Sequence, residues 1–291
     1  MSAQLIYTPR GRAREYSPWA LNLFDGLCGH QRMDMTVPAC AYCFAAQLPA
    51  ARRKDSDPTC RPKRDLLGRL ERECARIVQA GGWPQERGPV LVSFTTDPLP
   101  KGRKDLQNTT GRALALLHNA GIPVTLLTKN GADASAWITR SHLPGDEFAT
   151  SIVFDFRPYG GQFVHWEREA PNLFNRWVAL CEAHDRGLPT WVSVEPVIVP
   201  DEALEVIRYG QDLGVVGHYR IGPLNHHPHA ATVDWPRFGE RLAEVVADEL
   251  RWLRATGELP GGLPWDRQPA WRVRLWEHAL HEEERLTRAA L

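Results

Sequence analysis

Short runs of β-branched residues alternate with segments of helical periodicity along most of this 291-residue chain, and this alternation limits the fold more than any other feature. Strands are predicted over residues 20–24, 89–95, 123–128, 149–156, 190–194 and 219–222. Helices are predicted over residues 64–79, 105–119, 132–139, 172–186, 201–212 and 235–255. Gly121 and Gly214 stand where two of these helices are expected to end. A run of βα units predicts parallel strands joined by right-handed crossovers.

The predicted fold class is α/β, a partial (βα)6 barrel of the TIM type with a C-terminal helical extension. A doubly wound open sheet has the same order of elements, so the strand count alone does not separate the two architectures. We assign residues 1–256 to one barrel domain. Residues 257–291 are assigned to a linker rich in proline and glycine, followed by an amphipathic helix over 270–291. In both architectures ligands bind at the carboxyl ends of the strands, so the residues that follow each strand are the site candidates.

Composition excludes several classes of protein. Apolar residues make up 43% and charged residues 24% of the chain, which excludes a fibrous or wholly disordered protein. No run of about 18 uncharged apolar residues is present, and the N-terminus lacks the apolar segment of a secretory signal. We therefore expect a cytoplasmic protein whose six cysteines are reduced. Residues 1–130 hold 19 Lys and Arg against 11 Asp and Glu, and such a basic half fits either a solvated face or phosphate binding.

Three of the cysteines, Cys28, Cys40 and Cys43, follow the first predicted strand in a C-x11-C-x2-C arrangement. Two residues between Cys40 and Cys43 allow a tight loop to direct both thiolates at one metal centre, and Cys28 supplies a third. Three thiolates on a [4Fe–4S] cluster leave one iron open to a substrate or cofactor. A structural zinc ion would need a fourth ligand, such as His30.

The residues around these cysteines resemble a known family. Residues 6–16 read I-Y-T-P-R-G-R-A-R-E-Y, residues 26–30 read G-L-C-G-H, and residues 40–45 read C-A-Y-C-F-A. These blocks resemble the opening of the radical S-adenosylmethionine (radical SAM) proteins of the spore-photoproduct-lyase-like group. Later pieces are similar too: T-D-P at 96–98, T-K at 128–129, S-V-E-P at 193–196 and I-G-P-L-N at 221–225. One departure is the eleven residues between the first two cysteines, where the family has three.

The resemblance implies two cofactors and their ligands. A reduced [4Fe–4S] cluster held by Cys28, Cys40 and Cys43 would donate an electron to S-adenosylmethionine, whose cleavage yields a 5′-deoxyadenosyl radical. It implies that Lys129 pairs with the methionyl carboxylate and that Asp97 complements the methionyl amine. The residues expected to bind S-adenosylmethionine are Tyr42, Thr95, Thr96, Asp97, Lys129 and Ser151.

Two further residues follow the last strands and are candidates for a catalytic role, Glu195 and Asn225. A pair with Arg220 is the structural alternative for Glu195. The substrate is not readable, although the basic first half is compatible with nucleic acid. Repair of a thymine dimer would need a thiol beside the substrate, and no cysteine follows strands two to six. The expected partner is a one-electron donor such as a flavodoxin or ferredoxin. The competing hypothesis is a zinc-stabilised α/β binding protein without radical chemistry.

Overall fold

The computed structural model describes residues 4–10, 13–28, 40–47, 59–155, 162–225 and 227–256. The chain divides into two compact units. The first comprises Met1–Ile152 and Phe156–Trp191, and the second comprises Val153–Asp155 and Val192–Leu291. The predicted helix over 270–291 lies outside the described residues, and among those that are described no helix is both long and apolar enough to cross a membrane.

The sheet of the first unit has the order β1-β2-β5-β6-β7. Its strands are β1 (Ile6–Tyr7), β2 (Trp19–Leu21), β5 (Val90–Val92), β6 (Val124–Leu127) and β7 (Glu147–Ser151). The β2–β5, β5–β6 and β6–β7 pairs are parallel, as predicted, whereas the two residues of β1 pair with β2 in the antiparallel direction. A separate two-stranded ribbon pairs β3 (Phe24–Asp25) with β4 (Arg61–Pro62).

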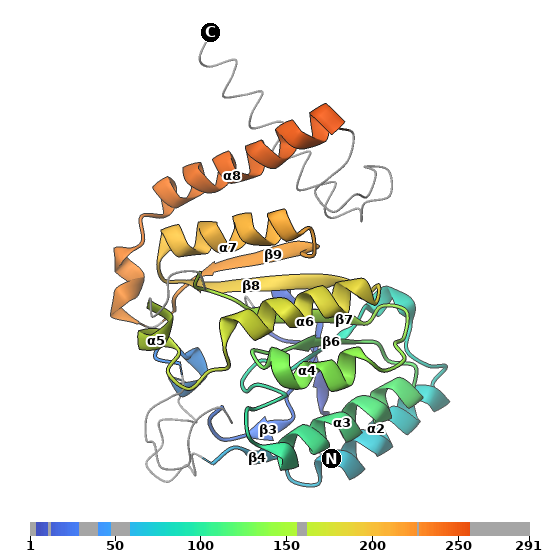
Figure 1. The fold of residues 1–291 in the computed structure, drawn as a ribbon. Coiled ribbons are helices and arrows are strands. Elements are labelled where there is room, and N and C mark those ends of the chain that lie inside the picture. The colour runs from blue at the N-terminus through green and yellow to red at the C-terminus, as the bar shows by residue number, and fades with distance from the viewer. Residues whose placement is uncertain are drawn as a thin grey trace. The chain divides into compact units, whose positions relative to one another are not determined.

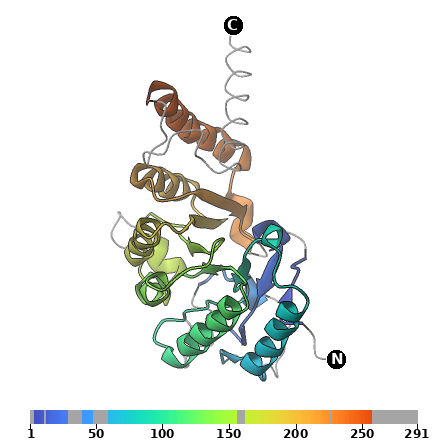
Figure 2. The ribbon, with the colours of Figure 1, turned by 90° about the vertical axis from the view of Figure 1, so that its right-hand side faces the viewer.

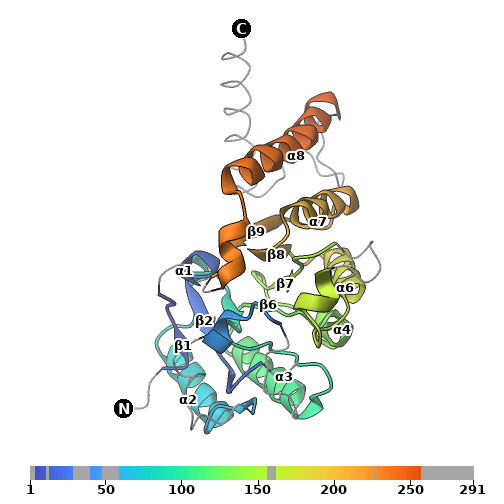
Figure 3. The same ribbon diagram turned by 90° about the vertical axis from the view of Figure 1, so that its left-hand side faces the viewer.

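Helices cover this sheet in two pairs. The helices α2 (Leu66–Gln79) and α3 (Lys104–Asn119) run side by side (Figures 1 and 2). The helices α4 (Gly131–Ile138) and α6 (Leu173–Asp185) pack together next to β6 and β7 (Figure 3). The short helices α1 (Ala13–Tyr16) and α5 (Gln162–Trp166) and the 3-10 turns η1 (Phe44–Gln47) and η2 (Gln85–Arg87) complete the unit.

Burial explains why the strands of the first unit read as apolar runs. All three residues of β5 and both Val124 and Leu126 of β6 are fully buried, which is typical of parallel strands covered on both faces. The buried side chains of Leu91, Ala149 and Trp191 form one core cluster, and Tyr16, Phe94 and Leu127 pack against it. The rings of Tyr16 and Trp191 meet edge to face, with their centroids 5.8 Å apart.

The second unit continues the βα alternation. It contains most of β8 (Thr190–Val197), then α7 (Pro200–Leu213), β9 (His218–Pro223), η3 (Pro228–Thr232) and α8 (Trp235–Thr256). The helix α7 packs against α8 (Figure 1). Tyr219 of β9 donates its hydroxyl to the carbonyl oxygen of Ile207 in α7 at 3.1 Å, which joins the strand to its helix.

The predicted strands and helices of the βα repeat are all present, with shifted ends. Gly121 and Gly214 adopt φ values of 70° and 67°, which confirms the helix ends expected there because glycine enters this region without steric cost. The largest shift concerns β7, which spans residues 147–151 instead of the predicted 149–156. Glu147 opens the strand because its carboxylate accepts hydrogen bonds from Thr125 Oγ1 at 2.9 Å and Trp191 Nε1 at 3.2 Å.

Candidate active site

The loop that follows β5 is fixed by one side chain at the end of β2. Asn22 Oδ1 accepts hydrogen bonds from the backbone N–H groups of Phe94 at 2.8 Å and Thr95 at 3.3 Å. It also accepts from the hydroxyl of Ser93 at 3.1 Å, while Asn22 Nδ2 donates to Tyr7 at 2.7 Å. Thr96 is buried, with its hydroxyl 3.4 Å from that of Ser93. Two residues expected to bind S-adenosylmethionine, Thr95 and Thr96, thus lie on a loop with a defined shape.

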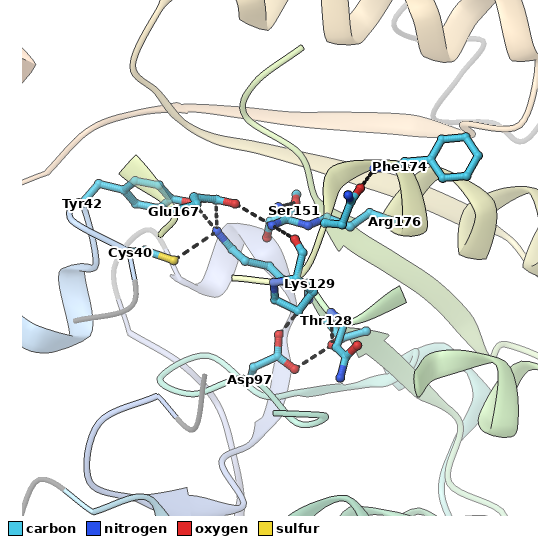
Figure 4. Close-up of polar contacts among 12 residues, drawn as sticks. Cys40, Tyr42, Asp97, Thr128, Lys129, Ser151, Glu167, Phe174 and Arg176 are labelled. Carbon is cyan, nitrogen blue, oxygen red and sulfur yellow. Dashed lines mark hydrogen bonds and ion pairs between the residues drawn. The ribbon is translucent and has the colours of Figure 1, made fainter. Parts of the chain in front are cut away.

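Asp97 joins the carboxyl ends of β5 and β6. Its Oδ1 accepts from the hydroxyl of Thr128 at 2.6 Å and from the N–H of Leu99 at 2.8 Å, and its Oδ2 accepts from the N–H of Lys129 at 2.7 Å (Figure 4). Both carboxylate oxygens therefore have partners within the protein. This arrangement gives Asp97 a structural role, and its contact with a methionyl amine stays a prediction.

Lys129 follows β6 and directs its ammonium group toward the cysteine turn (Figure 4). Lys129 Nζ lies 3.8 Å from Cys40 Sγ. It also donates to the hydroxyl of Tyr42 and to Oε1 of Glu167, and it lies 4.6 Å from the centre of the Tyr42 ring. The ammonium thus connects two parts of the resemblance that are 89 residues apart in the sequence.

Two residues of the site, Glu167 and Arg176, were not among the predicted residues. Both are buried, at 1% and 0% exposure, and Arg176 Nη2 donates to Glu167 Oε2 at 2.5 Å. Arg176 also donates to the carbonyl oxygens of Ser151 and Pro171, each at 2.7 Å. Burial opposes ionisation of Glu167, but Arg176 and Lys129 outweigh it and lower the pKa of the carboxyl group to about 2.

The cysteine turn packs against this buried pair. The N–H of Cys43 donates to the carbonyl oxygen of Cys40 at 3.0 Å, and the N–H of Ala41 donates to that of Trp166 at 2.8 Å. These bonds place Cys40 and Tyr42, both buried, beside Glu167. Burial raises the pKa of the Cys40 thiol to about 11, against the opposing effect of the Lys129 charge. Burial and then the Glu167 charge raise the pKa of Tyr42 well above its ordinary value, so this phenol stays neutral.

The remaining predicted residues are placed as follows. Cys28 and Cys43 are half-buried. Ser151 ends β7 and offers its carbonyl oxygen to Arg176. Glu195 in β8 and the exposed Asn225 after β9 belong to the second unit, so their catalytic role stays a prediction. His30 lies outside the described residues.

The chemistry of the donor set fits an iron–sulfur cluster in part. Cys40 and Cys43 are held in one turn, and an ammonium group faces the Cys40 sulfur, where it opposes the rise in thiol pKa that burial causes. Over the described ranges, however, no group of three or more Cys, His, Asp and Glu side chains is gathered around one metal position. The structure therefore brings two of the predicted ligands together, and the participation of Cys28 stays a prediction.

The fold is similar to that of solved structures of spore photoproduct lyase. A double mutant of that enzyme with bound AdoMet and dinucleoside spore photoproduct matches with a TM-score of 0.52 and 17% identity, over 78% of this chain and 61% of that chain. Two single mutants match with TM-scores of 0.51 and 0.50 at 16% identity, over 79% and 74% of this chain and 64% and 58% of theirs. The chain thus spans about three fifths of the length of these enzymes. No family model and no curated protein matches the sequence.

At 16–17% sequence identity, the similarity to the spore photoproduct lyase structures establishes the fold of this chain and nothing further. The prediction of an α/β protein with a mostly parallel sheet, of the partial TIM-barrel type, is confirmed.

Proposed function

We propose that this chain is a radical SAM enzyme. The observation that carries the proposal is the contact between Lys129 Nζ and Cys40 Sγ at 3.8 Å. It joins the cysteine turn to the residue after β6, and both pieces were selected from the sequence because they resemble that family. The fold likeness to spore photoproduct lyase supports the proposal, since that enzyme was solved with AdoMet bound.

In this proposal Cys28, Cys40 and Cys43 hold a [4Fe–4S] cluster and leave one iron open for S-adenosylmethionine. When bound, the cluster supplies the electron for reductive cleavage of the sulfonium and so starts radical chemistry. The residues proposed to line the S-adenosylmethionine site are Tyr42, Thr95, Thr96, Asp97 and Ser151, and Lys129 lies beside the cluster ligand Cys40 at the edge of that site.

The chain's own contribution is placement and exclusion of water. The cysteine turn is docked by the bond from Ala41 to Trp166, and Asn22 and Asp97 fix the loops after β5 and β6. The buried Tyr42 and Glu167 cover the Cys40 side of the site. Loops held by buried polar side chains keep ligand groups in one geometry, which is what a reaction through a reactive radical requires.

We propose a nucleic acid as the substrate class and a flavodoxin or ferredoxin as the electron donor. The substrate proposal is supported by the basic residues of the first half, of which Arg64, Lys101 and Lys104 are exposed. The solved enzyme of similar fold holds a dinucleoside photoproduct. Glu195 and Asn225 are the residues proposed to act on the substrate.

The test is anaerobic purification followed by metal analysis. The proposal expects a brown protein with about four iron and four sulfide per chain, and formation of 5′-deoxyadenosine after addition of dithionite and S-adenosylmethionine. Cys40→Ala and Cys43→Ala should lose both the colour and the product. Cys181→Ala is the matched control, because Cys181 lies within the helix α6 and is not part of the C-x11-C-x2-C motif, and it should keep both.

Two results would contradict the proposal. A colourless protein with one zinc ion per chain would favour a zinc-stabilised binding protein. Equal iron loss in Cys40→Ala, Cys43→Ala and Cys181→Ala would mean that the thiols do not act as specific ligands.

A further inference from the structure

The ammonium group of Lys129 already has a protein partner for each of its three hydrogens. They are Sγ of Cys40 at 3.8 Å, the hydroxyl of Tyr42 and Oε1 of Glu167. The side chain is only 15% exposed. A fourth partner, such as the carboxylate of S-adenosylmethionine, would therefore have to displace one of these contacts.

The ammonium group of Lys129 is also fixed by a buried ion pair. Glu167 Oε1 accepts a hydrogen bond from Lys129, and Glu167 Oε2 accepts one from Arg176. The side chains of Glu167 and Arg176 are both buried. Arg176 is in turn fixed by the carbonyl oxygens of Ser151 and Pro171. If Lys129 moved away from Glu167, the buried carboxylate would keep only Arg176 as a cationic partner, and this loss would cost free energy.

The charged groups beside Cys40 carry more positive than negative charge. Lys129 and Arg176 are two cationic groups, and Glu167 is the anionic group that pairs with both. One net positive charge thus lies in a low-dielectric environment next to Cys40. A hydrogen bond and a positive charge at a ligating sulfur both stabilise the added electron of a reduced iron–sulfur cluster.

We propose that Lys129 is a positioning and tuning residue that donates a hydrogen bond to the Cys40 thiolate of the cluster and raises its reduction potential. In this chain its main partner is a cluster ligand and not the carboxylate of S-adenosylmethionine. Glu167 and Arg176 are the residues that hold the ammonium in place. The inference rests on the proposed function, because it assigns Cys40 as a cluster ligand.

The experiment is an anaerobic redox titration of the reconstituted protein without S-adenosylmethionine, followed by measurement of the S-adenosylmethionine dissociation constant on the oxidised protein. Lys129→Met should load the same amount of iron as the wild type. Its equilibrium constant for reduction should fall about tenfold, which moves the one-electron midpoint about 59 mV more negative. The dissociation constant should stay within about twofold of the wild type.

Two further variants make the test specific. Lys104→Met is the matched control, because Lys104 pairs with Asp133 at 2.7 Å on the surface and is 72% exposed, so its midpoint should equal that of the wild type. Glu167→Gln removes the negative charge beside the ammonium while its amide oxygen can still accept from Lys129, so a shift in the opposite direction, to a more positive midpoint, is expected. If Lys129→Met fails to load iron, the midpoint of Glu167→Gln decides the question.

The opposing results are distinct. An unchanged midpoint in iron-loaded Lys129→Met would overturn the inference, and a tenfold weaker dissociation constant with that unchanged midpoint would assign Lys129 to the S-adenosylmethionine carboxylate. An unchanged midpoint in Glu167→Gln would overturn it where Lys129→Met cannot be loaded. A wild-type protein that binds no iron would instead overturn the proposed function.

Discussion

Glu167 and Arg176 form an ion pair that solvent does not reach, with 2.5 Å between Oε2 and Nη2. Glu167 directly follows α5, and Arg176 lies on the first turn of α6, so the pair connects the two ends of the loop between these helices. Because the same carboxylate also receives Lys129, this structural pair is connected directly to the site. Removing either partner should therefore lower the stability of the fold and disturb the position of the Lys129 ammonium group.

The first prediction concerns Arg176→Met. This change leaves the Glu167 carboxylate buried with only Lys129 as its cationic partner, and a broken buried pair costs about 3–5 kcal/mol of unfolding free energy. Urea unfolding of the cluster-free protein at neutral pH measures the loss. Arg72→Met is the control, because the pair of Arg72 with Asp65 is exposed and is worth about 0–1 kcal/mol. Equal losses of unfolding free energy in Arg176→Met and Arg72→Met would show that the buried pair stabilises the fold no more than the exposed pair does.

The second prediction separates the two roles open to Asp97. In Asp97→Asn the new amide replaces one of the oxygens that now receive the N–H groups of Lys129 and Leu99. One donor then faces another, and an unsatisfied buried group costs about 1–3 kcal/mol. The cluster-free protein should therefore lose stability in a thermal or urea unfolding experiment. A variant as stable as the wild type, with weaker S-adenosylmethionine binding, would favour the ligand role instead.

The third prediction tests how Asn22 shapes the loop after β5. Asn22→Ala removes the acceptor of two backbone N–H groups, those of Phe94 and Thr95, and should weaken S-adenosylmethionine binding about tenfold, which corresponds to about 1.4 kcal/mol. Asn22→Asp keeps the acceptor and should bind nearly as well as the wild type. Equilibrium titration of the cluster-loaded, oxidised proteins gives both constants. If Asn22→Ala and Asn22→Asp weakened S-adenosylmethionine binding equally, the hydrogen bonds to the side-chain oxygen of residue 22 would not be the reason for the weaker binding.

The sequence was sufficient for the βα repeat because each element carries its own periodicity. The apolar runs around β5 and β6 are buried on both faces, and the helices between them end where glycines stand. The motif residues after β5 and β6 were also found, because the carboxyl ends of parallel strands meet at one edge. The sequence alone therefore indicates both Lys129 and Cys40 as site candidates.

Glu167 and Arg176 could not be selected in this way. Glu167 stands beside Arg168 and Glu169 and has the local pattern of a solvated surface, and Arg176 is one arginine in a helix with mixed polarity. Their burial depends on how α5 and α6 fold back toward Cys40, which is a tertiary contact without a local signal. The start of β7 was misplaced for a related reason, since Glu147 pairs with Thr125 of β6 in the sheet and its carboxylate accepts hydrogen bonds from the side chains of Thr125 and Trp191.

The last prediction concerns pH and the carboxylate of Asp146, which is 1% exposed. Its oxygens accept from the N–H groups of Val124 and Leu143, each at 2.8 Å, and lie 3.1 Å from His118 Nε2 and 3.4 Å from His142 Nδ1. Burial opposes ionisation, but the bond from His118 and the two N–H groups outweigh it and lower the pKa below the ordinary 3.8.

Because the pKa of Asp146 is lower in the folded than in the unfolded chain, the unfolded chain binds the proton more readily. The stabilisation by this carboxylate is therefore present above pH 3.8 and is lost as the pH falls toward the folded-state pKa. Asp146→Asn should cost about 1–3 kcal/mol at neutral pH, because one N–H group loses its acceptor. That difference from the wild type should shrink as the pH falls below 3.8, because the wild-type carboxyl group then takes up its proton. Urea unfolding at several pH values measures it, and a difference that stays constant over this range would rule out the carboxylate charge as its source.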